Sequence, residues 1–290
     1  STLWGVISDV LSWLSCPHCA TALIAEAAPG SRLLCEEGHA FDVARPGYVS
    51  LLAGSGAAGT ADTAAMVADR AAFLAAGHYA GIADLVAELA READAKVPKD
   101  SADGACVVDL GAGTGYYLAR VLDALDADGR HRPGIALDIS KHAARHAAKA
   151  HPRIGAVVAD AWAGLPVRGH AASVLLNVFA PRNPHEMRRV LHPDGRAIVV
   201  VPEPGHLREL IEEYGLLAVD DRKPERLRAQ FADRFHIERE HLFEQRLALT
   251  ADEVAQVIGM GPNAWHAGAE QVRSGAEVSL AVRAYVLSVR

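Results

Sequence analysis

Residues 106–115 have the sequence CVVDLGAGTG, and this stretch decides the fold. The run CVVDL is short and apolar and ends near Asp109, which is typical of a buried strand. Gly111, Gly113 and Gly115 come next, before a segment with helical spacing. Glycines let a backbone turn sharply and approach a ligand closely. The stretch therefore predicts a strand, a ligand-binding loop and a helix, although a short glycine motif alone is shared by several nucleotide-binding folds.

Strand and helix signals alternate on both sides of this loop. Further strands are predicted at 133–140, 154–161, 171–180, 195–204 and 278–290. Helices are predicted at 114–125, 141–151, 184–191 and 206–217, and one or two more at 64–92. Strands that alternate with helices indicate an α/β fold with a mostly parallel sheet covered on both faces.

Three of the predicted strands end in acidic residues, namely Asp109, Asp138 and Asp160. Ligands bind at the carboxyl ends of the strands in such sheets, and a carboxylate there accepts hydrogen bonds from ribose hydroxyls. Three acids suit a ribose, an amine and an adenine better than a pyrophosphate, which favours bare amides. The segments VDLGAGTG, ALDIS and ADAW resemble the successive cofactor motifs of Rossmann-like S-adenosylmethionine-dependent methyltransferases. The alternative is an NAD-binding domain, but the loop lacks the GxGxxG pattern.

A second group of residues has metal-ligand spacing. Cys16 and Cys19 form a C-x2-C pair, and Cys35 and His39 follow as C-x3-H. Three thiolates and one imidazole suit tetrahedral zinc, and four protein ligands close the site, which is typical of a structural ion. His18 competes with His39 as the fourth ligand. The alternative to a zinc site is that the cysteines are free thiols that bind no metal. The fourth cysteine, Cys106, is expected to be a small buried hydrophobe.

Composition sets limits on the class of protein. The chain has 290 residues, 50% of them hydrophobic, and a net charge of −7. No apolar run of 18 or more residues predicts a membrane span, and the first residues lack the basic region of a signal peptide. The basic segments PRNPHEMRRV (181–190) and DDRKPERLRAQ (220–230) also carry acids, so charge alone favours ordinary solvated helix faces. We expect a cytoplasmic protein with three parts: a zinc module at 1–50, a linker with helices at 51–104, and the α/β domain at 105–290.

Two polar residues at strand ends are candidates for the reaction. Asn177 ends the predicted strand 171–180, where it either orients a substrate base or merely caps the strand. His206 follows the strand 195–204, where it either lines the methyl-transfer pocket or has no role. Tyr116, Tyr117, Trp162 and Phe179 are candidate stacking surfaces for a base, with core packing as the alternative for each.

Taken together, these segments resemble one family, the bacterial 23S rRNA guanine-N1 methyltransferases that act on the loop of hairpin 35. The resemblance rests on Cys16, Cys19, Cys35 and His39 and on the segments GHAFDVARPGYVSLL, AAFLAAGHY, VDLGAGTGYY, FAPRNPHEMRRVLHPDGR and PEPGHLREL, which occur in this order. It implies a zinc-bearing recognition module, a Rossmann-like methyltransferase domain and a cleft for the RNA hairpin. It also implies an S-adenosylmethionine site with the following residues: Tyr79, Asp109, Gly111, Gly113, Thr114, Gly115, Tyr116, Asp138, Asp160, Ala161 and His206.

Two departures point to a branch of that family. The linker AGSGAAGTADTAAM lacks basic residues, and the late segment MGPNAWHAG differs from the commoner form. Both resemble the actinobacterial tylosin-resistance branch, which modifies guanine-748 and not guanine-745. The expected partner is hairpin 35 of 23S rRNA, with no DNA, no membrane and a homodimer as one possible assembly. The alternatives are a small-molecule methyltransferase and an inactive zinc-bearing RNA-binding protein.

Overall fold

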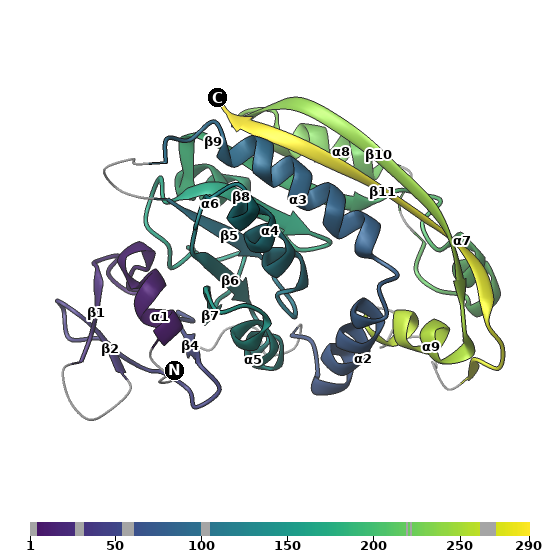
Figure 1. Cartoon of the computed structure of the whole chain (residues 1–290), viewed down its shortest axis with the longest axis horizontal. Helices are drawn as coiled ribbons and strands as arrows, with labels where there is room; N and C mark the ends of the chain where they lie inside the picture. The colour runs from purple at the N-terminus through teal and green to yellow at the C-terminus, as the bar shows by residue number, and fades with distance from the viewer. Residues whose placement is uncertain are drawn as a thin grey trace.

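The fold was analysed in a computed structural model, which describes residues 5–26, 32–53, 61–99, 105–218, 220, 222–261 and 271–290. A large twisted sheet with helices on both faces forms the body, and the N-terminal segments form a lobe at one end (Figure 1). The helices are α1 (Gly5–Val10), α2 (Ala64–Ala75), α3 (Ala80–Asp94), α4 (Tyr116–Ala127), α5 (Lys141–Ala150), α6 (Pro184–Val190), α7 (Arg208–Tyr214), α8 (Lys223–Phe231) and α9 (Ala251–Gly259), with a 3-10 turn at Leu11–Trp13.

Three short strands make a small sheet in the N-terminal lobe, in the order β1-β2-β3. They are β1 (Leu23–Ala25), β2 (Arg32–Cys35) and β3 (Ala40–Asp42). The large sheet has the order β10-β11-β9-β8-β5-β6-β7-β4. Its strands are β4 (Tyr48–Ser50), β5 (Cys106–Leu110), β6 (Gly134–Asp138), β7 (Ile154–Val158), β8 (Ala172–Val178), β9 (Leu191–Pro202), β10 (Phe235–Leu249) and β11 (Ala276–Val289).

The predicted α/β fold is confirmed, and the order of its strands places the ligand edge. Strands β4 to β9 pair in parallel, so their carboxyl ends lie at one edge of the sheet. β10 and β11 form a long antiparallel pair that adds to β9 through β11. Only half of this pair was predicted, because β10 was not expected. All three acidic strand ends and the glycine loop lie at the carboxyl edge.

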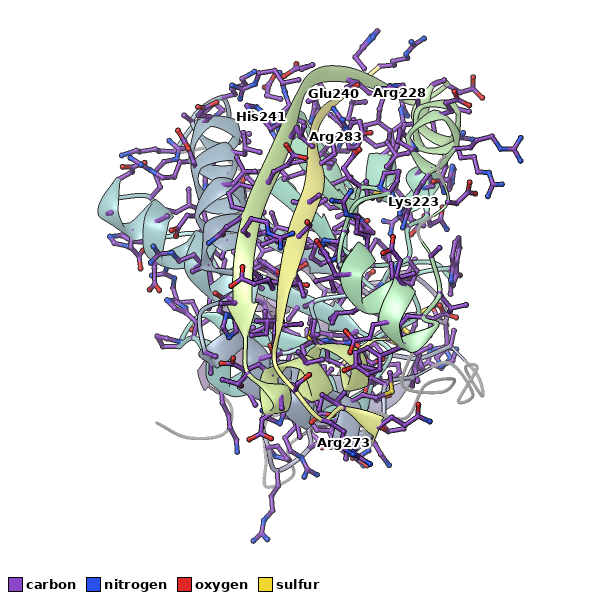
Figure 2. All side chains as sticks on the ribbon, turned by 90° about the vertical axis from the view of Figure 1, so that its right-hand side faces the viewer. Lys223, Arg228, Glu240, His241, Arg273 and Arg283 are labelled. Atoms are coloured by element: carbon purple, nitrogen blue, oxygen red, sulfur yellow. The ribbon has the colours of Figure 1, made fainter. Side chains whose placement is uncertain are left out.

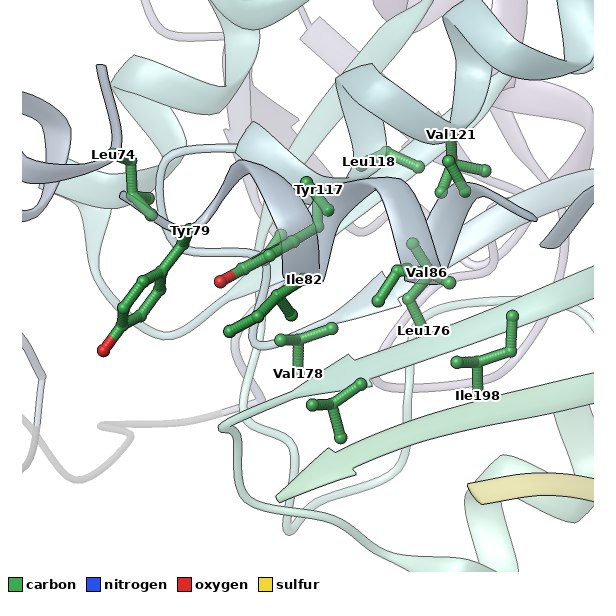
Figure 3. Packing of buried hydrophobic residues seen from close by; sticks show 14 of the residues in the cluster. Leu74, Tyr79, Ile82, Val86, Tyr117, Leu118, Val121, Leu176, Val178 and Ile198 are labelled. Atoms are coloured by element: carbon green, nitrogen blue, oxygen red, sulfur yellow. The ribbon is translucent and has the colours of Figure 1, made fainter. Parts of the chain in front are cut away.

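Two layers of apolar side chains sandwich the large sheet. Along β5, Val107 packs toward one face, whereas Cys106 and Val108 pack toward the other, as the alternation of a strand requires. The first face is covered by α2, α3, α4, α5, α7 and α9, and the second by α1, α6, α8 and the N-terminal lobe. Figure 3 shows Ile82 and Val86 of α3 above Leu176 of β8. The helix α3 therefore belongs to the packed body.

The N-terminal lobe is joined to the large sheet along β7. The three residues of β4 pair in parallel with β7, and Leu14 forms a bridge with Val167. Helix α1 packs on the same strand so closely that a Cβ built at Gly155 would lie 2.3 Å from a methyl carbon of Val10. Movement of the zinc-bearing lobe would therefore have to disturb this edge of the sheet. The division of the chain at residues 50 and 104 stays a proposal.

In the parts of the chain that the structure describes, no helix is long and apolar enough to cross a membrane. Two segments suggested the branch of the family. Residues 54–60 of AGSGAAGTADTAAM and residues 262–268 of MGPNAWHAG lie outside the described residues.

Candidate functional site

The glycine loop forms the floor of a cavity of about 580 Å³ at the carboxyl edge of β5, β6 and β7. Gly111 has a φ of 77°, and a Cβ there would lie 2.3 Å from the Cβ of Ala180, so no other residue fits this turn. Gly115 is the N-cap residue of α4 and has a φ of 80°, and a Cβ there would lie 3.0 Å from the Cα of Ala147 in α5. The first glycine thus permits the turn, and the second permits two helices to approach each other.

Asp138 links the loop to the next strand. One of its carboxylate oxygens accepts a hydrogen bond from the backbone N–H of Gly113, and the other accepts from the N–H of Ser140, both at 2.8 Å. Burial raises the pKa of Asp138, and the two amide donors oppose that rise. Because each carboxylate oxygen has a further lone pair, Asp138 can still accept a ligand hydroxyl in the cavity.

Most of the predicted cofactor residues line this cavity. They are Tyr79, Gly111, Gly113, Thr114, Tyr116, Asp138, Asp160 and Ala161. Asp160 also accepts a hydrogen bond from the N–H of Trp162 at 2.9 Å, which fixes the turn after β7. Asp109 and Gly115 lie behind the lining. Asp109 is 1% exposed, and burial together with the nearby charge of Asp138 raises the pKa of its carboxyl to about 8. Contacts of Asp109 and Gly115 with a cofactor stay predictions.

A second cavity, of about 550 Å³, adjoins the first. Four residues line both cavities: Arg70, Tyr79, Phe179 and Met260. His206 lines only the second one. The rings of Tyr79, Phe179 and His206 lie within 6.3 Å of one another by their centroids, so an aromatic wall separates the two spaces. Figure 3 shows the hydroxyl of Tyr79 pointing away from the apolar core.

His206 is held as a neutral ring. The N–H of Ala281 donates to its Nδ1 at 3.4 Å, so Nε2 carries the proton and faces the Tyr79 hydroxyl, also at 3.4 Å. Burial lowers the pKa of His206 to about 4. His206 lies two residues before α7, and not inside that helix as the sequence suggested.

Asn177 is fully buried and lines neither cavity. Its side-chain amide donates to the backbone oxygens of Leu110 and Pro181, so it ties the end of β5 to the chain after β8. Phe179 lies between Asn177 and Pro181 in the sequence and adopts a φ of 54°, which is unusual for a bulky residue. The strained turn leaves the Phe179 ring 39% exposed at the junction of the cavities. A direct role of Asn177 in the reaction stays a prediction.

Sequence reasoning missed the wall that helix α2 contributes. Met66, Arg70 and Leu74 recur every four residues and face the first cavity together. Arg70 pairs with Asp62 and donates to the backbone oxygen of Met260 at 2.6 Å. The four-residue spacing was visible in the sequence, but only the fold shows that this face covers a ligand site rather than the core.

The four predicted zinc residues come together in the N-terminal lobe. The Sγ of Cys19 lies 3.6 Å from that of Cys35, and His39 Nδ1 lies 3.6 Å from Cys16 Sγ. All four ligand atoms lie within 4.8 Å of one another. Zinc–sulfur and zinc–nitrogen bonds of about 2.0–2.3 Å would separate tetrahedral ligands by about 3.3–3.8 Å, so the residues fit this ion. The ring of His18 packs beside His39 and Phe41 and is not one of the group.

Comparison with known proteins agrees with both sites. A zinc-ribbon family model described as "RlmA, N-terminal" matches residues 14–54. The 23S rRNA (guanine(748)-N(1))-methyltransferase of Streptomyces fradiae is 47% identical over 259 residues, which cover 89% of this chain and 88% of that protein. The chain belongs to the 23S rRNA (guanine-N(1)-)-methyltransferase family. The predicted family, enzyme class, fold and zinc module are therefore confirmed.

Two further relatives carry provisional names in the same family. The protein of Micromonospora griseorubida is 47% identical, over 89% of this chain and 88% of its own length. YxjB of Bacillus subtilis strain 168 is 30% identical, over 90% of each chain. Each match covers about nine-tenths of this chain. S-Adenosylmethionine is the methyl donor of this class of enzyme.

Proposed function

We propose that this protein transfers a methyl group from S-adenosylmethionine to N1 of guanine-748 in the hairpin 35 loop of 23S rRNA. We choose guanine-748 because the chain is 47% identical, over 89% of its length, to the Streptomyces fradiae methyltransferase whose name specifies that nucleotide. The Bacillus subtilis relative, at 30%, is more distant. Macrolide resistance of the tylosin type would follow from this modification, and the ribosomal substrate implies a cytoplasmic location.

The two adjoining cavities support this reaction. The first, with Asp138, Asp160 and the glycine loop, suits the cofactor, and the second would receive the guanine across the wall of Tyr79 and Phe179. S-Adenosylmethionine, when bound, supplies a methyl group on a positively charged sulfur, which is already activated for transfer. The residues of the chain then need mainly to align the guanine, and alignment can lower a barrier by about 7–11 kcal/mol.

We expect the three residues of the aromatic wall, Tyr79, Phe179 and His206, to have different roles. Phe179, held open by its left-handed backbone, would stack on the guanine once that base has left the loop of the hairpin. Nε2–H of His206 donates to the Tyr79 oxygen, which leaves the Tyr79 proton free to face the ligands. His206 would thus position Tyr79 and would not accept the proton of guanine N1. Asn177 would act through the turn that it anchors.

The zinc module would recognise the RNA. It contributes β4 to the edge of the sheet, and its lobe lies beside β7, whose carboxyl end bears Asp160 (Figure 1). A zinc ion held by Cys16, Cys19, Cys35 and His39 would stabilise a segment that is too small to hold a core of its own. Dimer formation also stays a proposal.

The test is transfer of labelled methyl groups from S-adenosylmethionine to a synthetic hairpin 35 RNA. We expect incorporation into the hairpin, with an affinity that falls steeply as salt rises, because RNA phosphates release counterions when they are bound. Incorporation into small molecules without salt dependence would support the alternative of a small-molecule methyltransferase. Tight cofactor binding without any transfer to RNA would contradict the proposal.

A further inference from the structure

Arg70 of α2 lies where the two cavities meet and lines both of them. A Cβ built at Gly113 would lie 3.4 Å from Nη1 of Arg70, so the guanidinium lies beside the glycine loop. Among the described residues that line the first cavity, Arg70 is the only cationic side chain, and the lining also includes the carboxylates of Asp62, Asp138 and Asp160. The first cavity therefore has one place that suits an anionic group of a ligand.

The guanidinium of Arg70 is held in a fixed position and keeps donors for a ligand. Nη1 donates to a carboxylate oxygen of Asp62, and Nη2 donates to the backbone oxygen of Met260 at 2.6 Å. A guanidinium carries more N–H donors than these two bonds use, and its planar shape fixes their directions. The Arg70 side chain is 23% exposed, so it is not sealed from the cavities that it lines.

Asp62 is the other half of this ion pair, and its backbone is tied to the next strand. The backbone oxygen of Asp62 accepts a hydrogen bond from the Ser140 hydroxyl at 2.8 Å, and the N–H of Ser140 donates to Asp138. These bonds fix the Arg70–Asp62 pair relative to the strand end that bears Asp138. Because a carboxylate accepts hydrogen bonds at both of its oxygens, Asp62 can bind an ammonium group while it pairs with Arg70.

Other arginine–carboxylate pairs of the chain lie outside the site. Figure 2 shows Arg228, Glu240 and Arg283 together near the upper end of β10 and β11, where Arg228 pairs with Glu240 at 2.9 Å. None of these three residues lines either cavity. The Arg70–Asp62 pair differs from them because both of its members line the first cavity.

The amino-acid end of S-adenosylmethionine is the part of the cofactor whose charges match this pair. It is a zwitterion, with a carboxylate and an ammonium group on the same carbon atom. The carboxylate is the only anionic group of the cofactor, and a guanidinium donates strong charge-assisted hydrogen bonds to carboxylates. We propose that Arg70 binds the α-carboxylate of S-adenosylmethionine and that Asp62 binds its α-ammonium.

This assignment orders the cofactor along the edge of the sheet. The strands β5, β6 and β7 are neighbours in this order. The amino-acid end would lie beside the glycine loop after β5, the ribose at Asp138 after β6, and the adenine toward Asp160 after β7. Because Arg70 also lines the second cavity, the sulfonium next to the amino-acid end would lie near the junction of the two cavities. The inference rests on the proposed function only in taking the first cavity as the cofactor site.

The experiment compares two ligands that differ only at the amino-acid end. S-Adenosylhomocysteine carries this group, whereas 5′-methylthioadenosine ends in a methyl group instead, and the sulfur of both is uncharged. Calorimetry measures the affinity of each ligand for the wild type, Arg70→Gln and Arg70→Lys. We expect Arg70→Gln to bind S-adenosylhomocysteine roughly 10–100-fold more weakly and methylthioadenosine with wild-type affinity, because hydrogen bonds to the carboxylate are lost. Arg70→Lys keeps the charge without the planar fork and should keep part of the preference for S-adenosylhomocysteine.

Two further variants separate binding from folding. The double variant Asp62→Asn, Arg70→Gln leaves no unpaired charge of the pair and should lose the same preference. Arg228→Gln is the matched control, since Arg228 pairs with a carboxylate but lines neither cavity, and it should keep both affinities.

Three results would overturn the assignment. They are a wild type that does not prefer S-adenosylhomocysteine, a preference that survives in the double variant, and equal losses for both ligands in Arg70→Gln with a lower melting temperature. The last result would show that Arg70 only ties α2 to Met260. Methylation of hairpin 35 RNA by the wild type is measured separately. A preference that depends on Arg70, in a protein that methylates no RNA, would support this inference and contradict the proposed function.

Discussion

The hydroxyl of Tyr79 lies 3.4 Å from Nε2 of His206, at the wall between the two cavities. The N–H of Ala281 occupies the other ring nitrogen, so the imidazole is a donor toward Tyr79. His206, a candidate for the reaction from its place in the sequence, is thus arranged in the structure as a fixed, neutral hydrogen-bond donor.

We therefore expect His206 to position the Tyr79 hydroxyl and not to transfer a proton. We expect His206→Ala to raise KM for S-adenosylmethionine or lower kcat by roughly tenfold, because Tyr79 loses its partner. The pH profile of kcat/KM in the wild-type protein should show no group with a pKa near 6.5 that disappears in this variant. Such a disappearance would identify His206 as a titrating base, and wild-type kinetics in His206→Ala would remove any role.

The same histidine should affect stability in acid. Because burial lowers its pKa to about 4, below an unfolded value of about 6.5, the stabilising contribution of the neutral ring is fully present above the unfolded pKa. That contribution is lost as the pH falls toward about 4. Denaturant unfolding of wild type and His206→Gln should show a smaller loss of unfolding free energy in the variant over this range. Parallel curves would contradict the burial of an uncharged ring.

The turn at Gly111 should tolerate no side chain. With a φ of 77° and a Cβ that would lie 2.3 Å from Ala180, Gly111→Ala must displace the loop or the turn after β8. We expect a loss of roughly 1–3 kcal/mol in stability and a large loss of S-adenosylmethionine affinity, measured by calorimetry. Gly205→Ala is the control, since no atom lies within 4 Å of its Cβ position. Normal cofactor binding by Gly111→Ala would show that the loop does not form the cofactor site.

Zinc should be structural. Cys35→Ser should lose the metal and lower the melting temperature. Cys106 lies on β5 and is not one of the four clustered residues, so Cys106→Ser should retain one zinc per chain. Metal content and thermal unfolding measure both effects. Because β4 pairs with β7, chelation should also raise hydrogen exchange in β7. If chelation leaves the hydrogen-exchange protection of β7 unchanged, the stability of the sheet does not depend on the zinc site.

The sequence predicted those features whose signal is local. CVVDLGAGTG, the acidic strand ends and the Cys/His spacing each carry their chemistry within a few neighbouring residues. The strand β10 was not expected because most of its residues are at least partly exposed and many are charged, so it lacks the apolar alternation of a half-buried strand. It forms because β11 pairs with it along its length. The three residues of β4 are too few for any pattern.

Other features depend on contacts between distant segments. The α2 face with Met66 and Arg70 becomes a cavity wall only after the chain folds over the sheet. Asn177 appeared to be a candidate for substrate contact, but its position at the strand end cannot show that Leu110 and Pro181 would take its donors.

The methylated nucleotide can be located by reverse transcription of hairpin 35 RNA, because a methyl group on guanine N1 blocks base pairing and stops the polymerase. The RNA is incubated with the protein and S-adenosylmethionine, and guanine-to-adenine changes at positions 745 and 748 serve as controls. We expect one stop, at guanine-748, that disappears when that guanine alone is replaced. A stop at guanine-745, or labelled RNA without a stop in the loop, would show that guanine-748 is not the methylated nucleotide.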